Sequence, residues 1–279
     1  MKILKIIITV VLLSTFTFGC DSEKNVTEPT VDSNDSLQVE GYKLVWNDEF
    51  DTDGKPDETK WDYDIGGKGW GNNELQYYTD DSVNARVRNG KLEIEAHYYP
   101  NLDIEYTSAR LVTRNKGDWK YGRIEVRAKI PAGLGTWPAI WMLSTDWEYG
   151  GWPASGEIDI MEHVGYDQNK IHGSVHTDAY NHKIGTQKSN QIIIPTASTE
   201  YHNYTIEWEA EKIDFFVDNE KYFSFTNEHK TSAEWPFDKR FHLILNLAFG
   251  GNWGGAQGID NSIFPVKMNI EYVRVYKKE

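Results

Sequence analysis

Three carboxylates in one short apolar run constrain this chain more than any other feature. The run is Glu157-Ile-Asp-Ile-Met-Glu162. Side chains of a regular β-strand alternate between its faces, so Glu157 and Asp159 share one face while Glu162 points the other way, into a core. A buried, unpaired charge is costly. A helix does no better, because it places Glu157 and Glu162 about 140° apart.

A β-bulge near Ile160-Met161 removes this conflict. The extra residue of a bulge resets the alternation of side chains, and bulges are common beside active sites. With the bulge, all three carboxylates line one wall of a cleft. The sequence therefore predicts a bulged strand over residues 157–162, with Glu157, Asp159 and Glu162 as its functional residues.

The first residues resemble an export signal rather than part of a fold. Two lysines precede an apolar run over residues 6–13, and small and polar residues follow. We expect a secretory signal peptide over residues 1–19, since the run is too short to span a bilayer well. Cys20 is the single cysteine of the chain and stands where a bacterial lipoprotein is cut and lipidated, although Thr17 replaces the usual leucine.

The segment that follows Cys20 is polar. Residues 20–40 are rich in Ser, Asp, Asn, Thr and Glu, which predicts a flexible tether. The sequence therefore predicts an exported lipoprotein of the outer membrane or cell surface, with the periplasmic side as the alternative. The lipid is its expected membrane contact, and residues 41–279 form the folded domain.

From residue 42 onward the apolar pattern is that of β-strands. Residues 123–130 alternate, with Ile124, Val126, Ala128 and Ile130 on one face and charged residues on the other. Residues 241–249 are nearly all apolar, as in a strand buried on both faces. Further strands are expected at 91–97, 204–208, 212–217, 220–225 and 268–276. Without a long amphipathic helix or an internal repeat, these strands predict one all-β jelly-roll sandwich.

The net charge and the aromatic content limit the classes of partner and substrate that we expect for this chain. The net charge of −14 disfavours a nucleic-acid partner and, more weakly, a polyanionic substrate. The 11 Trp and 16 Tyr are typical of a large core or of a cleft that stacks sugars. A charged edge strand or a three-acid cation site would explain the acids alone. Because tryptophans and histidines flank the acids on both sides, we favour a polysaccharide groove.

Paired carboxylates that face one cleft are the equipment of glycoside hydrolysis. One carboxylate attacks the anomeric carbon while the other protonates the leaving oxygen. Carboxyl groups about 5–5.5 Å apart retain the anomeric configuration, whereas groups about 6.5–9.5 Å apart invert it. We expect retention for Glu157 and Glu162. Asp159 lies between them, and close acids push each other's pKa values apart.

With these motifs in view, the chain resembles glycoside hydrolase family 16, in particular its bacterial laminarinase-like endo-β-1,3(4)-glucanases, over residues 42–276. The 157–162 motif matches the family's bulged catalytic signature. Flanking matches are Trp46-Asn-Asp-Glu-Phe50, Gly71-Asn-Asn-Glu-Leu-Gln-Tyr-Tyr78, Ser108-Ala-Arg-Leu111, Trp137-Pro-Ala-Ile-Trp-Met142, Gly250-Gly-Asn-Trp253 and Glu271-Tyr-Val-Arg-Val-Tyr276.

The resemblance implies a concanavalin-like jelly roll of two antiparallel sheets with a concave substrate cleft. It also implies a retaining mechanism, with Glu157 as nucleophile, Asp159 as its assistant and Glu162 as acid/base. The positions that match substrate-contacting residues of similar enzymes are Trp70, Asn72, Arg110, Trp137, Trp141, His176 and Trp253. A zinc site at His172 and His176 lacks a third ligand at metal spacing.

Many relatives carry one structural calcium ion on the convex face and need no catalytic cofactor. The resemblance places its ligands at Glu49, the Gly90 carbonyl and Glu271, although relatives more often have Asp at position 271. Oxygen ligands suit calcium. Solvated surface acids are the alternative explanation.

Three hypotheses for function follow from these features. The first is a monomeric endo-β-glucanase acting on β-1,3-glucan or mixed-linkage β-1,3/1,4-glucan; Met161 fits the laminarinase-like branch. The second is a hydrolase of a marine galactan such as agar, porphyran or carrageenan, and the acidity of the chain disfavours a sulfated substrate. The third is a non-catalytic glycan-binding lipoprotein. Such proteins usually lose a catalytic acid, whereas both glutamates are present here.

Overall fold

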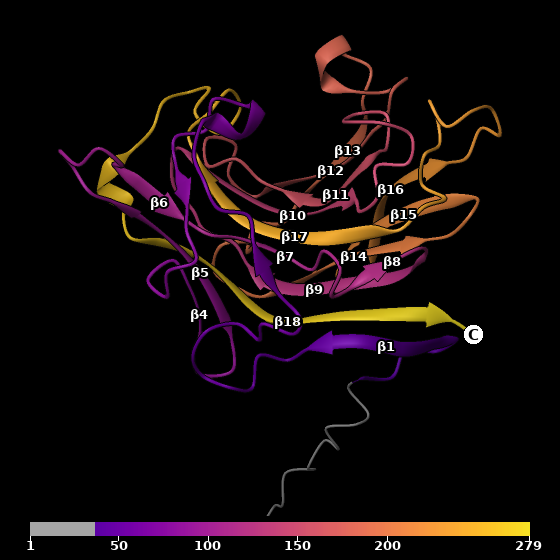
Figure 1. The fold of residues 1–279 in the computed structure, drawn as a ribbon, viewed down its shortest axis with the longest axis horizontal. Coiled ribbons are helices and arrows are strands. Elements are labelled where there is room, and N and C mark those ends of the chain that lie inside the picture. The colour runs from indigo at the N-terminus through magenta and orange to yellow at the C-terminus, as the bar shows by residue number, and fades with distance from the viewer. Residues whose placement is uncertain (1–36) are drawn as a thin grey trace, which may run out of the picture. The chain divides into compact units, whose positions relative to one another are not determined.

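Two β-sheets, antiparallel except for one short strand pair, lie face to face in the computed structural model, which describes residues 37–279 (Figure 1). The predicted signal peptide, Cys20 and most of the predicted tether lie outside the described residues. The segment Gln38–Glu279 forms one compact unit. The predicted jelly-roll sandwich is confirmed. No helix within the described part of the chain is long and apolar enough to cross a membrane.

The concave sheet carries the 157–162 motif near its centre. Its strands follow the order β13-β12-β11-β10-β17-β7-β2, with β8 paired to β17. Their bounds are β2 Asp62–Tyr63, β7 Arg110–Val112, β8 Asp118–Trp119, β10 Thr136–Ser144, β11 Glu157–Glu162, β12 Lys170–His176, β13 Lys188–Ile193 and β17 Phe241–Phe249.

The second sheet packs behind the concave sheet. Its order is β16-β15-β14-β9-β18-β5-β6-β3, with β1 on β18 and β4 on β5. The bounds are β1 Tyr42–Asp48, β3 Tyr77–Tyr78, β4 Ala85–Val87, β5 Leu92–Tyr98, β6 Tyr106–Ser108, β9 Gly122–Lys129, β14 His202–Trp208, β15 Lys212–Val217, β16 Glu220–Thr226 and β18 Val266–Lys278. Helical segments between residues 37 and 279 are short 3₁₀ turns, among them η2 Gly69–Gly71, η3 His182–Ile184 and η4 Asn261–Ile263.

The core fills the space between the sheets, as the strand patterns predict. Ile124, Val126 and Ala128 of β9 are fully buried. All nine residues of β17 are buried, which confirms the prediction of a strand covered on both faces. Alternate β17 residues from Phe241 to Leu247 pack into the core, while Asn246 and Ala248 face the cleft above the sheet. A single strand therefore supplies both core and cleft floor.

One close backbone approach fixes the end of the motif strand. Gly165 follows β11, and its N–H donates to the Thr136 carbonyl at the start of β10. A Cβ atom at this position would lie 1.7 Å from the Gly133 carbonyl oxygen, so only glycine fits. The contact holds the chain after Glu162 against the edge of the cleft.

Candidate active site

The predicted bulge interrupts β11 at the predicted place. On β10, Ile140 pairs with Met161 and Trp141 pairs with Asp159, so Ile160 has no partner. The pairing of β11 with β12 also shifts register, between Asp159 and Glu162. Ile158, Ile160 and Met161 consequently pack into the core, while the three carboxylates line the cleft on the opposite face.

The cleft runs across the concave sheet and has a volume of about 840 Å³. Strands β10, β11, β12 and β17 form its floor, and loops from both ends form its walls. The structure brings all ten predicted catalytic and substrate-contacting residues to this one cleft. They are Trp70, Asn72, Arg110, Trp137, Trp141, Glu157, Asp159, Glu162, His176 and Trp253. Their individual roles stay predictions.

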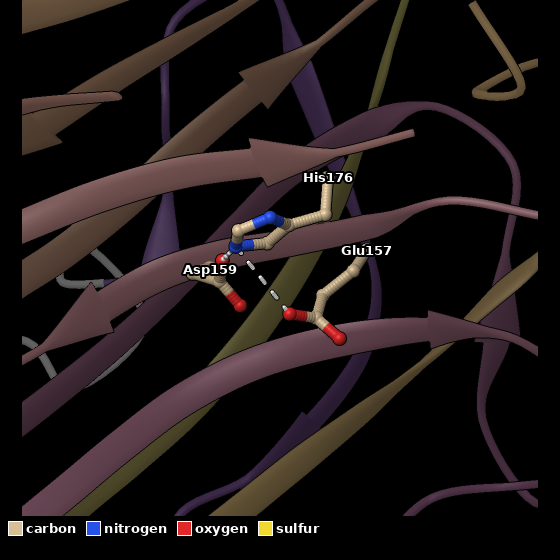
Figure 2. Close-up of side chains that lie close together, drawn as sticks. All are labelled: Glu157, Asp159 and His176. Atoms are coloured by element: carbon tan, nitrogen blue, oxygen red, sulfur yellow. Dashed lines mark ion pairs between the residues drawn. The ribbon is translucent and has the colours of Figure 1, made fainter. Parts of the chain in front are cut away.

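Two groups surround the Glu157 carboxylate. Trp152 Nε1 donates a hydrogen bond of 2.9 Å to Oε2. His176 lies directly opposite Glu157 on β12, and its Nε2 is 3.7 Å from Oε1. The indole donor stabilises the ionised carboxylate, and the imidazole faces the same carboxylate (Figure 2).

Asp159 lies deepest of the three acids. It is only 2% exposed, and its Oδ2 lies 3.3 Å from His176 Nε2. The side chain of His176 points from β12 toward both carboxylates (Figure 2). Neither Asp159 Oδ2 nor His176 Nδ1 has a hydrogen-bond partner among residues 37–279. The contact between Asp159 and His176 therefore includes two polar atoms that make no hydrogen bond within the described residues.

Glu162 has a separate partner. Trp137 Nε1 donates to its Oε1 at 3.0 Å. The Trp137 ring meets Trp253 edge to face at 5.4 Å, and His172 meets Trp253 at 5.1 Å. Together these rings form an aromatic wall beside Glu162 that suits the stacking of a sugar ring.

Burial and mutual repulsion raise the pKa values of the acids. Burial raises the pKa of Asp159 to about 8. Burial and the Asp159 charge raise the pKa of Glu162 to about 8, against the lowering effect of the Trp137 hydrogen bond. Burial and Asp159 also raise the pKa of Glu157. The three therefore cannot all ionise near neutral pH, and His176 and the Trp152 hydrogen bond are the groups that favour the ionised form of Glu157 against its burial.

At the opposite side of the cleft, Arg110 is held in a fixed position. Its guanidinium lies between two indoles, 4.8 Å from the Trp70 ring centre and 4.7 Å from that of Trp141. Its Nε is 3.2 Å from Asp64 Oδ2. Arg110 is therefore pre-positioned beside Asp64, a carboxylate that it shares with Arg114, whose Nη2 donates to Asp64 Oδ1 at 2.6 Å.

Several cleft residues were not among the predicted site residues. Trp152 stands five residues before Glu157, a spacing that in hindsight marks it as a neighbour of the acid. Glu74 also lines the cleft, and burial raises its pKa. The turn η3 brings His182 against the Trp152 ring at 5.0 Å and Lys183 over it at 4.6 Å. Nothing in the sequence near η3 signals this contact, because it depends on how the loop folds back over the sheet.

The two acids among the expected calcium ligands, Glu49 and Glu271, already have cationic partners. Both carboxylate oxygens of Glu49 accept from Arg274, at 2.9 Å from Nε and 2.8 Å from Nη2. Glu271 accepts from Arg127 Nε at 2.7 Å. A calcium ion at these carboxylates would compete with two guanidinium groups. The side chains as placed do not form an oxygen cage for calcium.

Comparison with known proteins agrees with this geometry. Residues 70–274 match the model of the glycosyl hydrolases family 16. A beta-glucanase of Rhodothermus marinus is 57% identical over 244 residues, which cover 85% of each chain.

Solved structures give the same result. The laminarinase from Rhodothermus marinus aligns with a TM-score of 0.83 and 55% identity, covering 85% of this chain and 97% of that one. SCLam, a non-specific endo-β-1,3(4)-glucanase, aligns with a TM-score of 0.82 and 47% identity, covering 86% and 96%. The chain therefore belongs to glycosyl hydrolase family 16.

Proposed function

We propose that this protein is an endo-β-glucanase that hydrolyses β-1,3-glucan such as laminarin, mixed-linkage β-1,3/1,4-glucan, or both, with retention of configuration. One observation carries the proposal. The bulged strand β11 presents Glu157 and Glu162 to one tryptophan-lined cleft, and a separate indole N–H supports each carboxylate.

The geometry supports a double displacement. Glu162, with its raised pKa, holds a proton near neutral pH and donates it to the glycosidic oxygen. The Glu157 carboxylate attacks the anomeric carbon, so the glycosidic bond breaks as a covalent glycosyl-enzyme forms. Glu162 then removes a proton from a water molecule, which attacks the same carbon and releases Glu157.

Asp159 and His176 prepare Glu157 for this attack. A protonated Asp159 donates to Glu157 and relieves the repulsion between the two carboxylates. His176 faces both groups and stabilises the negative charge that returns to Glu157 when the glycosyl-enzyme breaks down. Both residues act on charge and position rather than on the sugar bond itself.

The cleft favours a neutral glucan over a sulfated galactan. Four acids line it, Glu74, Glu157, Asp159 and Glu162. The cations that line it are Arg110, which pairs with Asp64, and Lys183. SCLam is described with a 1,3-β-D-cellobiosyl-glucose at its active site, which supports including mixed-linkage glucan for this chain.

The decisive experiment incubates the protein with laminarin, lichenan, barley glucan, agarose and carrageenan and sizes the products. We expect oligosaccharides from at least one of the three glucans and none from the galactans. NMR of the first product should show the β-anomer. Absence of new reducing ends from every glucan would refute the proposal, and an α-anomer would refute retention.

The role of Glu157 is tested by Glu157→Gln, which keeps the size of the side chain and removes its charge. Turnover should fall below detection while laminari-oligosaccharide binding, followed by calorimetry, persists. A variant with nearly unchanged turnover would show that another group is the nucleophile.

Structural calcium is a separate proposal, supported only by the oxygen chemistry of Glu49, Gly90 and Glu271. Because two arginines hold the carboxylates, we expect any affinity to be weak. Melting temperatures in excess calcium and in excess chelator test it, since a bound ion stabilises the folded state. Identical melting temperatures in calcium and in chelator would refute a structural calcium ion.

We further propose that the protein is exported, lipidated at Cys20 and monomeric. The leader pattern and the position of the single cysteine support export and lipidation. Labelling of cells with a fatty-acid analogue, compared between the natural chain and Cys20→Ser, tests the anchor. Protease treatment of intact cells distinguishes the outer surface from the periplasm, and light scattering gives the mass in solution.

A further inference from the structure

Glu157, Asp159 and His176 bring three potential metal-ligand atoms together in the cleft (Figure 2). One carboxylate oxygen from each acid and one imidazole nitrogen all lie within 4.8 Å of one another. The sequence alone does not reveal this set of ligands, because the two acids lie on β11 and the histidine lies on β12. Only the pairing of Glu157 with His176 brings them together.

Two of the three separations between these atoms fit a small transition-metal ion. Zinc binds histidine nitrogen and carboxylate oxygen at about 2.0–2.2 Å, so neighbouring ligands of a tetrahedral site lie about 3.3–3.6 Å apart. His176 Nε2 lies 3.3 Å from Asp159 Oδ2 and 3.7 Å from Glu157 Oε1. These separations are long for direct hydrogen bonds and close to the edges of a zinc tetrahedron.

A buried atom without a hydrogen bond also points to a ligand here. Asp159 is 2% exposed, and its Oδ2 makes no hydrogen bond within the described residues. An unsatisfied buried acceptor is costly. A metal ion between the three side chains would satisfy this oxygen, and the open cleft would supply a water molecule as fourth ligand.

We propose that Glu157, Asp159 and His176 form an inhibitory site for Zn²⁺ and ions of similar ligand preference. The imidazole nitrogen selects such ions over Ca²⁺ and Mg²⁺, which prefer oxygen ligands. A bound ion occupies Glu157 Oε1 and prevents the carboxylate from attacking an anomeric carbon. The metal site itself does not depend on which glycan the cleft accepts.

The surroundings of His176 make the site reversible. A resident zinc ligand almost always donates its second ring N–H to a carboxylate, carbonyl or water, and loss of such a partner costs about 10–100-fold in affinity. His176 Nδ1 has no partner between residues 37 and 279. The ion therefore binds as an exchangeable inhibitor and not as a permanent structural or catalytic metal.

Calorimetry with Zn²⁺ alone tests the proposal on tag-free protein in a buffer that does not bind metals. We expect one saturable site per chain, weakened at least about tenfold in His176→Gln and in Asp159→Asn. The matched control is His172→Gln, which removes a second imidazole from the same strand and the same cleft. It should leave zinc affinity unchanged, and Mg²⁺ should give no comparable heat.

Wild-type protein provides a readout that does not depend on variants. Co²⁺ in place of Zn²⁺ should give the strong visible absorption of a low-coordinate site, and Zn²⁺ should displace it. In parallel, Zn²⁺ should inhibit glucan hydrolysis and a chelator should restore it. The proposal is overturned by no saturable zinc binding up to about 1 mM, by unchanged binding in His176→Gln, or by loss of binding in His172→Gln. A spectrum of hexaaqua cobalt alone would also overturn it.

Discussion

The hydrogen bond from Trp137 to Glu162 should set the alkaline limit of activity. Its Nε1 donates at 3.0 Å to the carboxylate that we propose as acid/base. The donor stabilises the ionised form and so lowers the pKa of Glu162, while burial and Asp159 raise it, with the balance at about 8. Activity should therefore decline above about pH 8, as Glu162 loses the proton that it must donate.

Trp137→Phe removes the donor and keeps an aromatic ring. A hydrogen bond to a charged group contributes about 1.5–3 kcal/mol, and about 1.4 kcal/mol corresponds to one pKa unit. Because water can enter the cleft and replace part of the interaction, we take the lower end of this range. The alkaline limb of kcat should then move upward by about one pH unit. At neutral pH kcat should fall by up to about tenfold, because the acid is weaker.

The assay is the pH profile of kcat on a soluble glucan, with Trp141→Phe as matched control. Trp141 lies on the same strand, but its Nε1 donates to Asn246 Oδ1 at 2.6 Å and not to an acid. Its replacement should weaken substrate binding beside Arg110 and leave the alkaline limb in place. An unmoved limb in Trp137→Phe, a downward shift, or an equal shift in both variants would refute the argument.

Three further predictions concern the hydrogen bond to the proposed nucleophile Glu157 and the stability of the fold. Trp152→Phe removes the donor to Glu157 and should lower kcat about tenfold in steady-state assays; an unchanged kcat would contradict that role. Arg274→Met breaks the pair with Glu49 and should destabilise the fold by about 2 kcal/mol in urea titrations. The pair lowers the pKa of Glu49. The stability that it contributes is therefore present above the ordinary carboxylate pKa and is lost as the pH falls through the lowered pKa of Glu49, so the free energies of unfolding of the variant and the natural chain should converge in acid. A difference that stays constant with pH would count against the pair. Gly165→Ala should cost more than about 4 kcal/mol or prevent folding, whereas Gly151→Ala, with open space around its Cβ, should melt like the natural chain.

The strands and the bulge could be predicted because each leaves a local pattern. The alternation over residues 123–130 and the apolar run 241–249 appear as β9 and β17 with nearly the same bounds. The bulge was predictable for a different reason. Three acids of mixed parity in an apolar strand leave few arrangements that do not bury a charge, and the structure shows the arrangement with Ile160 unpaired.

Contacts that form only through the tertiary fold could not be predicted. Asp64, just after β2, pairs with Arg110 of β7, and η3 places Lys183 over Trp152. No periodicity links such residues, since their positions depend on sheet order and loop path. The arginine partners of Glu49 and Glu271 were missed for the same reason, because a family pattern marks the acids without showing which cations face them.

Placing all three acids on one six-residue strand separates reaction chemistry from substrate choice. The relative positions of Glu157, Asp159 and Glu162 depend on the local backbone of β11 and its two neighbouring strands. The aromatic walls come from other parts of the chain, including η2, η3 and the segment around Trp253. Loops can therefore be lengthened, shortened or exchanged without moving one carboxylate relative to another. A scaffold of this kind lets new glycan preferences arise by loop replacement while the stereochemical course stays fixed, and it makes loop grafting a sound route to altered specificity.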